Sequence, residues 1–488
     1  MPYRDVSFYV ELDYNFDGTF TDETDRVISF NVERSISGIG NPFLGSSGRI
    51  DRAVVNLQNV DRRYSSKVTT GALYSLIANG KLFHVPIRIG INTGGSDYRI
   101  FTGICKLPVE PNGTSKVGKS IQITAYSNEE KYINSKISLT TTKLQEWFTS
   151  NPTEDTALDY VLTLIGESGY TLDPGLYNIL PYYNDRSAMA VLWDIAKSAG
   201  GFLFTDRLGE FKFYNAAHLA GSTSLGIFDR DDFGLVNMSY PDINLAKKVT
   251  VSGNFYKLGT DGTLFEAENT YTILPNGTLD IEFDLTDPAY SIGSITFDAL
   301  SLSGTDISAD ISLSYDFTVE KAILSFVSTN AGYCIISNLT VTGVPLVTES
   351  FKVSKISSDS FWSDRVGSNL ETSVNQTYIQ SESIATTIAQ LILNAQQLPN
   401  CSLQIQDFIY SSPLELLDVI TIADNNLITD ATDIAITDLE YSFSSSGARC
   451  NIKGIDLTNI YPYLTDGYFI LGTNKLGNTD PLKERLFY

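Results

Sequence analysis

Apolar and polar residues alternate along the first part of the chain, with the period of a β-strand that buries one face. Within the run 52–59, for example, Ala53, Val55 and Leu57 alternate with neighbours that are mostly polar. Six such runs, separated by clusters of Gly, Asn, Asp and Pro, fall within residues 1–135. Short strands at this spacing predict a β-barrel or β-sandwich domain.

A helical period replaces the alternation within residues 136–245. In the segment 185–214, apolar residues recur at helical spacing and form one stripe, which consists of Ala188, Leu192, Ile195 and Ala199. Asp185 can cap the start of this helix, and Gly200-Gly201 can end it. The aromatic runs that follow, joined by a turn sequence, predict a β-hairpin. Because this unit contains no nucleophile, general base or ligand set, it indicates a structural role in a peripheral α+β domain.

Three further segments complete the expected organisation. Residues 246–380 contain strand-like runs between turn sequences and predict a second β-rich barrel or sandwich domain. Residues 381–460 are expected to form an α+β closing segment, since an amphipathic helix that ends before Pro399 precedes two strands. The C-terminal tail, 461–488, has no periodicity and is expected to order only against a partner. The predicted fold class is therefore multidomain and mainly β, with α+β parts.

Composition and charge narrow the classes of function. A chain of 488 residues is too long for one apolar core. Its 57 acidic against 34 basic residues give a net charge of −23, which repels phosphate backbones and argues against sequence-specific binding of nucleic acid. We expect a soluble chain with no export signal and no membrane-spanning segment. The four cysteines form no CxxC pair, which favours buried free thiols over zinc or redox sites.

The sharpest local motif is a D-x-N-x-D-G sequence near the N-terminus. Asp13, Asn15 and Asp17 supply alternating oxygen ligands and Gly18 allows a sharp turn, as in the first half of an EF-hand calcium loop. The second half departs from that pattern, because Thr24 stands where the bidentate glutamate belongs. A plain Asp-Gly β-hairpin is the alternative. Calorimetric titration with calcium distinguishes the two interpretations.

No catalytic constellation stands out from the sequence. The two histidines, His84 and His218, lie near no serine elbow and no second metal-type ligand in the chain. Carboxylate pairs at 129–130 and 231–232 are expected by chance in a chain this acidic, and sequence spacing does not reveal the separation that glycoside hydrolysis requires. We therefore predict no catalytic residues and no cofactor. A cell-wall hydrolase remains an alternative that a turbidity assay would reveal.

Several segments, taken in their order along the chain, resemble the tail-hub or tail-tip proteins of tailed bacteriophages, which are related to the baseplate hubs of contractile injection systems. The segments are DYNFDG at 13–18, GRIDRAVVNLQNVDRRYSS at 48–66, LYSLIANGKL at 73–82, RIFTGIC at 99–105, LWDIAKSAGGFLFTDRLGEFKF at 192–213 and FILGTNKLG at 469–477. They extend from the N-terminus to the C-terminus, so the resemblance spans nearly the whole chain.

The resemblance implies a structural, non-enzymatic hub in the virion, at the distal end of the tail. It implies a homotrimer in which two barrel domains per subunit form a pseudo-sixfold ring, with a tail tube or distal tail protein above and a central fibre or spike below. Residues 1–135 and 246–380 are the expected ring barrels. DNA would pass through without sequence-specific binding, which an acidic wall favours. A receptor-binding tail protein that grips host glycans or proteins is the other alternative, and adsorption to host cells would favour it.

Overall fold

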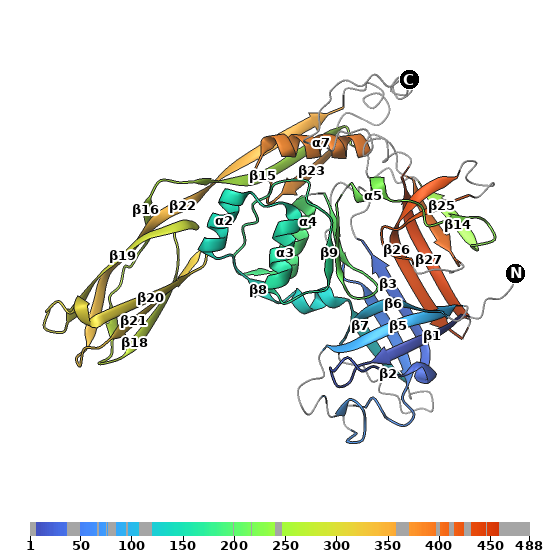
Figure 1. The fold of residues 1–488 in the computed structure, drawn as a ribbon, viewed down its shortest axis with the longest axis horizontal. Coiled ribbons are helices and arrows are strands. Elements are labelled where there is room, and N and C mark those ends of the chain that lie inside the picture. The colour runs from blue at the N-terminus through green and yellow to red at the C-terminus, as the bar shows by residue number, and fades with distance from the viewer. Residues whose placement is uncertain are drawn as a thin grey trace.

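The computed structural model describes residues 6–36, 49–65, 68–74, 76, 84–93, 96–106, 120–198, 200–215, 217–239, 246–357, 370–396, 401–408, 414–423, 431–445 and 447–457. These residues form a large body and an arm that projects from it (Figure 1). One apolar core runs through the body, from Val10 to Leu457, and the arm has a second core, from Leu264 to Val341. The fold is mainly β, as predicted.

One sheet of thirteen strands joins the two ends of the chain in the body. The N-terminal strands are β1 (Val6–Leu12), β2 (Thr21–Asp22), β3 (Val27–Ser35), β4 (Arg52–Gln58), β5 (Val85–Thr93), β6 (Ser96–Cys105) and β7 (Ser120–Tyr126), with the short helix η1 (Thr24–Arg26). The later strands are β13 (Ile227–Phe228), β14 (Leu235–Ser239), β24 (Ser402–Gln406), β25 (Val419–Ile422), β26 (Thr432–Ser444) and β27 (Gly447–Asp456). The main order is β14-β24-β27-β26-β3-β4-β7-β6-β5-β1-β2.

The contact between β3 and β26 makes this sheet continuous. The two strands are antiparallel, with Glu33 opposite Glu440 and Val32 opposite Tyr441. Among the described residues, the end strands β2 and β14 do not pair, so the sheet is open and the closed barrel expected for 1–135 is not present. For 246–380, where a barrel or a sandwich was expected, the described strands form separate sheets and no closed barrel. The described strands of 246–380 also contribute nothing to this sheet. Alternation predicts where strands lie but carries no information about which distant edges pair, which explains the error.

An α+β layer lies between the sheet and the arm (Figure 1). Its elements are η3 (Asn128–Tyr132), β8 (Lys136–Ile137), α2 (Thr141–Ser150), α3 (Glu154–Leu164), β9 (Tyr170–Leu172), β10 (Arg186–Ser187), α4 (Ala188–Ser198), β11 (Phe202–Thr205), β12 (Phe211–Tyr214) and α5 (His218–Gly221). The predicted helix and hairpin are confirmed as α4 and the antiparallel pair β11–β12. The hairpin gains a third strand, since β9 pairs with β12 in parallel.

The C-terminal end of α4 agrees with the prediction, whereas its N-terminal end does not. Gly200 has a φ of 66°, and its N–H bonds the carbonyl of Lys197, which ends the helix as expected. Asp185, however, does not cap the start. It lies before β10 with a φ of 47°, and its carboxylate pairs with Lys136 at 2.6 Å. Ala199, the last residue of the predicted stripe, lies outside the described residues.

The arm consists of two packed sheets whose long strands return to the body. Its elements are β15 (Lys248–Leu258), β16 (Gly262–Glu266), β17 (Tyr271–Ile273), β18 (Thr278–Asp284), β19 (Ala289–Ser301), η5 (Ser308–Asp310), β20 (Ile311–Phe317), β21 (Lys321–Ser328) and β22 (Cys334–Ile356). At the body, β15 and β22 pair, β23 (Glu371–Gln376) joins β15, and α7 (Glu382–Gln396), the predicted helix of the closing segment, packs on both long strands. No helix of the described residues is long and apolar enough to cross a membrane.

Candidate functional site

The side of the large sheet that faces away from the apolar core is polar across five adjacent strands. We call it the polar face. Along β27, β26, β3, β4 and β7, buried residues that are mostly apolar alternate with less buried ones that are mostly polar, with Val54 and the exposed Ile28 among the exceptions. The polar members are Arg449, Asn451, Lys453, Asp438, Glu440, Ser442, Ser29, Asn31, Glu33, Arg52, Asn56, Gln58, Ser120, Gln122 and Thr124.

Hydrogen bonds between neighbouring side chains order the polar face. They run from Asn451 to Glu440 (3.1 Å), from Asn31 to Glu33 (3.0 Å), from Asn56 to Ser29 (2.9 Å) and from Gln122 to Asn56 (3.3 Å). Over the β3–β26 contact the surface is hollowed by about 240 Å³, lined by acidic, basic and amide side chains. The face is therefore polar and mixed in charge, and several of its polar groups bond one another.

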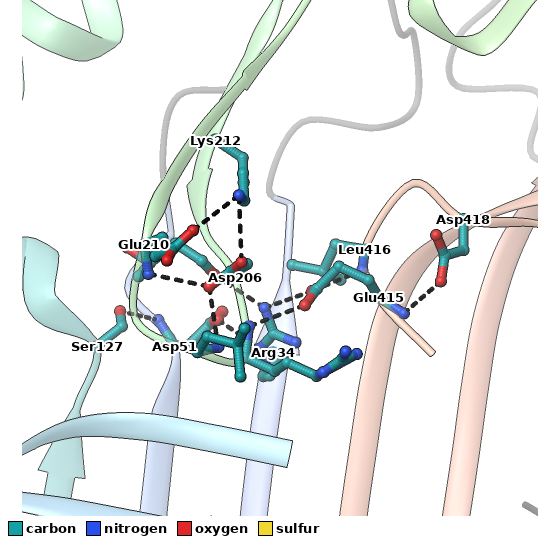
Figure 2. A network of polar contacts seen from close by, with 12 residues as sticks. Arg34, Asp51, Ser127, Asp206, Glu210, Lys212, Glu415, Leu416 and Asp418 are labelled. Carbon is teal, nitrogen blue, oxygen red and sulfur yellow. Dashed lines mark hydrogen bonds and ion pairs between the residues drawn. The ribbon is translucent and has the colours of Figure 1, made fainter. Parts of the chain in front are cut away.

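Beneath the polar face, a buried arginine ties three parts of the chain together (Figure 2). The side chain of Arg34 on β3 is 1% exposed, and its Nε donates to Asp51 at 2.9 Å. Its Nη2 lies 2.6 Å from Glu415 and donates to the carbonyl of Thr205, at the end of β11, at 2.8 Å. This Arg34 network thus connects the N-terminal strands, the hairpin of the α+β layer and the C-terminal strands.

Further hydrogen bonds hold the carboxylates of the Arg34 network in position. Glu415 accepts the backbone N–H of Arg207 in the hairpin turn at 2.8 Å. Its own backbone N–H donates to Asp418 at 2.7 Å, and Asp51 receives the backbone N–H of Ser35 at 3.1 Å. Because each carboxylate is held by backbone groups as well as by the guanidinium, the network fixes the relative positions of the segments that carry them.

Burial changes the protonation of these groups. Burial raises the pKa of Asp51 to about 7, although Arg34 acts in the opposite direction, and it raises the pKa of Asp418 to about 6. Burial likewise raises the pKa of Glu129, whose side chain accepts from Ser127. For Arg34, burial alone would lower the pKa, but Glu415 and Asp51 outweigh it and the net pKa is raised. The guanidinium therefore stays charged, while Asp51, Glu129 and Asp418 retain their protons more readily than usual because their pKa values are raised.

These raised pKa values predict a protein that is more stable in mild acid than at neutral pH. A carboxyl with a raised folded pKa binds its proton more tightly in the folded state, so the free energy of unfolding should fall as pH rises from about 4 to about 7. Thermal melts across this range should show the midpoint decreasing with pH. Asp51→Asn should flatten the dependence and Glu146→Gln, on exposed surface of α2, should not; equal slopes in the two variants would contradict this assignment.

The proposed calcium ligands lie in the loop between β1 and β2, which pair as an antiparallel hairpin. Asp13 is buried, and its carboxylate accepts the backbone N–H groups of Asn15, Asp17 and Gly18. At the twelfth EF-hand position, the Thr24 hydroxyl donates to Asp22 and accepts the backbone N–H of Val10, so its hydrogen bonds go to β1 and β2 and not to residues 13–18. Among the described residues, no group of three or more His, Cys, Asp and Glu side chains is arranged to hold a metal ion. Calcium binding by this loop stays a prediction.

The other groups considered for chemistry have structural partners. His218 pairs with Asp173 at 2.9 Å and stacks on Tyr214, with ring centroids 3.6 Å apart. Glu130 pairs with Lys106, and Asp232 accepts the backbone N–H of Asp229 in a turn. Cys105, Cys334, Cys401 and Cys450 are buried and form no disulfide, and burial raises the pKa of the Cys105 and Cys450 thiols. These groups therefore stabilise local structure.

Sequence reasoning did not identify the Arg34 network. One signal was available: Phe30, Val32 and Arg34 share the same phase of β3, so a charged residue occupies a position that the alternation assigns to the core. A buried arginine requires partners, but the sequence does not say that Asp51 and Glu415 provide them.

The fold is similar to those of phage tail proteins. The tail protein from Neisseria meningitidis MC58 is 9% identical, with 95% of this chain and 97% of that chain covered and a TM-score of 0.48. The prophage MuSo2 43 kDa tail protein from Shewanella oneidensis is 10% identical, with coverage of 92% and 97% and a TM-score of 0.45. A chain of the Francisella PdpA–VgrG complex is 10% identical, with coverage of 94% and 59% and a TM-score of 0.41. No family model and no curated protein matches the sequence.

Proposed function

We propose that this chain is a structural hub at the distal end of a phage tail, where it adapts a sixfold tail tube to a threefold tip and forms part of the passage for DNA. The observation that carries the proposal is the single sheet in which strands from both ends of the chain lie side by side beneath one polar face. The role is non-enzymatic and places the chain in the virion.

The chemistry of the polar face suits a surface along which DNA moves. The DNA backbone carries dense negative charge, and clusters of Lys and Arg bind it strongly. On the polar face the acidic residues Glu33, Asp438 and Glu440 match the basic residues Arg52, Arg449 and Lys453 in number, so cations are not in excess. Amide and hydroxyl groups that bond one another, as Asn56 does, have less capacity left to hold a passing phosphate.

The topology of the large sheet changes which segments of the chain we assign to the ring. We assign its two units in each subunit to residues 1–135 and 381–460, in place of 1–135 and 246–380, because β3 pairs with β26. Three subunits then supply six units around the passage. Residues 136–245 form the peripheral α+β domain that braces the ring through the Arg34 network, apart from β13 and β14, which belong to the large sheet. Residues 246–380 contain the arm. The tail, 461–488, would meet the central fibre or spike.

The assembly state tests the proposal. The purified chain should give a light-scattering mass of three times the 53.7 kDa chain, or, mixed with the tail-tube protein that adjoins it, a complex that contains three copies of the chain. Imaging of the tail end should show threefold density beneath a sixfold tube. A chain that stays strictly monomeric under both conditions would refute the hub role.

A further inference from the structure

The arm carries an unusual concentration of negative charge. Residues 259–345 contain twelve acidic side chains and a single basic one, Lys321. The whole chain has a net charge of −23, so this segment accounts for about half of the imbalance within less than a fifth of the length. The acidic residues extend over both arm sheets, with exposed examples at Asp280, Asp298 and Asp316. A field of this sign attracts basic partners and repels acidic ones.

The far end of the arm exposes large apolar side chains. In the register of the arm sheet, Ile273 on β17 and Ser301 on β19 both lie opposite Cys334 at the start of β22. The next residues toward the end are Leu274, Leu302 and Tyr333, with exposed fractions of 63%, 70% and 45%. We call these three residues the tip. Because the strands that carry them are neighbours, the tip is a local apolar patch within an acidic surface.

The base of the arm is held firmly against the body. The turn between β20 and β21 inserts Val319 into the body core, and its N–H donates to the carbonyl of Leu139 at 3.1 Å. Glu320 accepts hydrogen bonds from Tyr182 and from Asn184 of the α+β layer. The tip is thus presented at the end of a braced projection (Figure 1).

We propose that the arm docks onto another protein whose surface is basic and contains an apolar hollow for the tip. Charge complementarity favours this occupant: twelve acidic residues on the arm would be repelled by anionic glycans, by anionic lipids and by a second acidic arm. Large side chains such as Leu302 bind best when a pocket removes them from water, while charges around them steer the encounter. The inference does not depend on the hub role, since binding can be measured on the full chain alone.

Peptide binding to the full-length chain tests the arm. The probe is a soluble peptide of repeated Lys-Leu pairs, compared with one in which Ser replaces every Leu and one in which Glu replaces every Lys. The Lys-Leu peptide should bind most tightly, and its affinity should fall about tenfold between about 0.1 M and about 1 M salt, where the Debye length shrinks from about 10 Å to about 3 Å. The Glu-Leu peptide should not bind.

Matched variants test whether the Lys-Leu peptide binds at the tip. The double variant Leu274→Ser and Leu302→Ser should weaken binding of the Lys-Leu peptide about tenfold. Ile356→Ser changes a residue that is 62% exposed at the body end of β22 and should leave the affinity unchanged. Equal affinities of the double variant and Ile356→Ser would overturn the proposal, as would salt-independent binding or binding to vesicles of anionic lipid. Because all three residues are largely exposed, the variants should remain folded, which thermal melts can verify.

Discussion

Replacing Arg34 by methionine should lower the free energy of unfolding by about 3–5 kcal/mol. It should also weaken the contact between the N-terminal strands and the C-terminal strands. Methionine keeps much of the side-chain length and apolar character, so loss of packing contributes little. The loss comes from Asp51 and Glu415, which would stay in the interior without the guanidinium that they contact at 2.9 Å and 2.6 Å. Unpaired buried charges are among the few causes of such large effects of single substitutions.

Chemical denaturation followed by far-ultraviolet circular dichroism measures this loss. Arg49→Met provides the matched control, because Arg49 is exposed and its contact with Glu33 is 3.7 Å long. An exposed pair of this kind contributes at most about 1 kcal/mol. If both variants lost the same stability, the Arg34 network would not be what joins the segments. Proteolysis should also cut the Arg34 variant faster near the 414–418 segment, since Glu415 loses a partner there.

Local features of the fold follow directly from the sequence. The helix α4 and the hairpin β11–β12 were predicted because their signals, a helical stripe, a Gly-Gly end and a turn sequence, all lie within thirty residues. The apolar positions along 434–443 change phase from Ile434 and Ile436 to Leu439, Tyr441 and Phe443, which predicts a bulge, and β26 changes register between Ile436 and Asp438. Each of these predictions depends only on neighbours in the chain.

Pairings between distant segments could not be predicted in this way. The contact of β3 with β26 joins strands about four hundred residues apart, and any exposed strand edge of suitable length could have taken that place. The same limit applies to the Arg34 network. The position of Arg34 in the alternation along β3 predicts that its charge is buried but does not identify its partners. The bulge in β26 lies close to both the β3–β26 contact and the Arg34 network. The carbonyl of Thr437, within the bulge, accepts the N–H of Ile36, two residues beyond Arg34.

Replacing Leu192 by aspartate should unfold the α+β layer and abolish the trimer that we propose. Leu192 is fully buried on α4, the helix that packs against α3 and β11. Loss of its apolar contacts alone costs about 2–5 kcal/mol, and burial of an unpaired carboxylate adds to that cost. The total is comparable with the entire stability of a typical domain, which is about 5–15 kcal/mol. We therefore expect aggregated or monomeric, partly unfolded protein in light scattering and a loss of the cooperative thermal transition.

The control for this variant is Leu164→Asp at the end of α3, where the side chain is about half exposed and the new charge can reach water. That variant should assemble normally. The comparison separates two roles of α4, because β11 ends at Thr205, whose carbonyl accepts from Arg34. If α4 braces the ring through this connection, Leu192→Asp disrupts both the α+β layer and the β3–β26 junction. If Leu192→Asp unfolds the layer while assembly persists, the ring units associate without it and the bracing role must be abandoned.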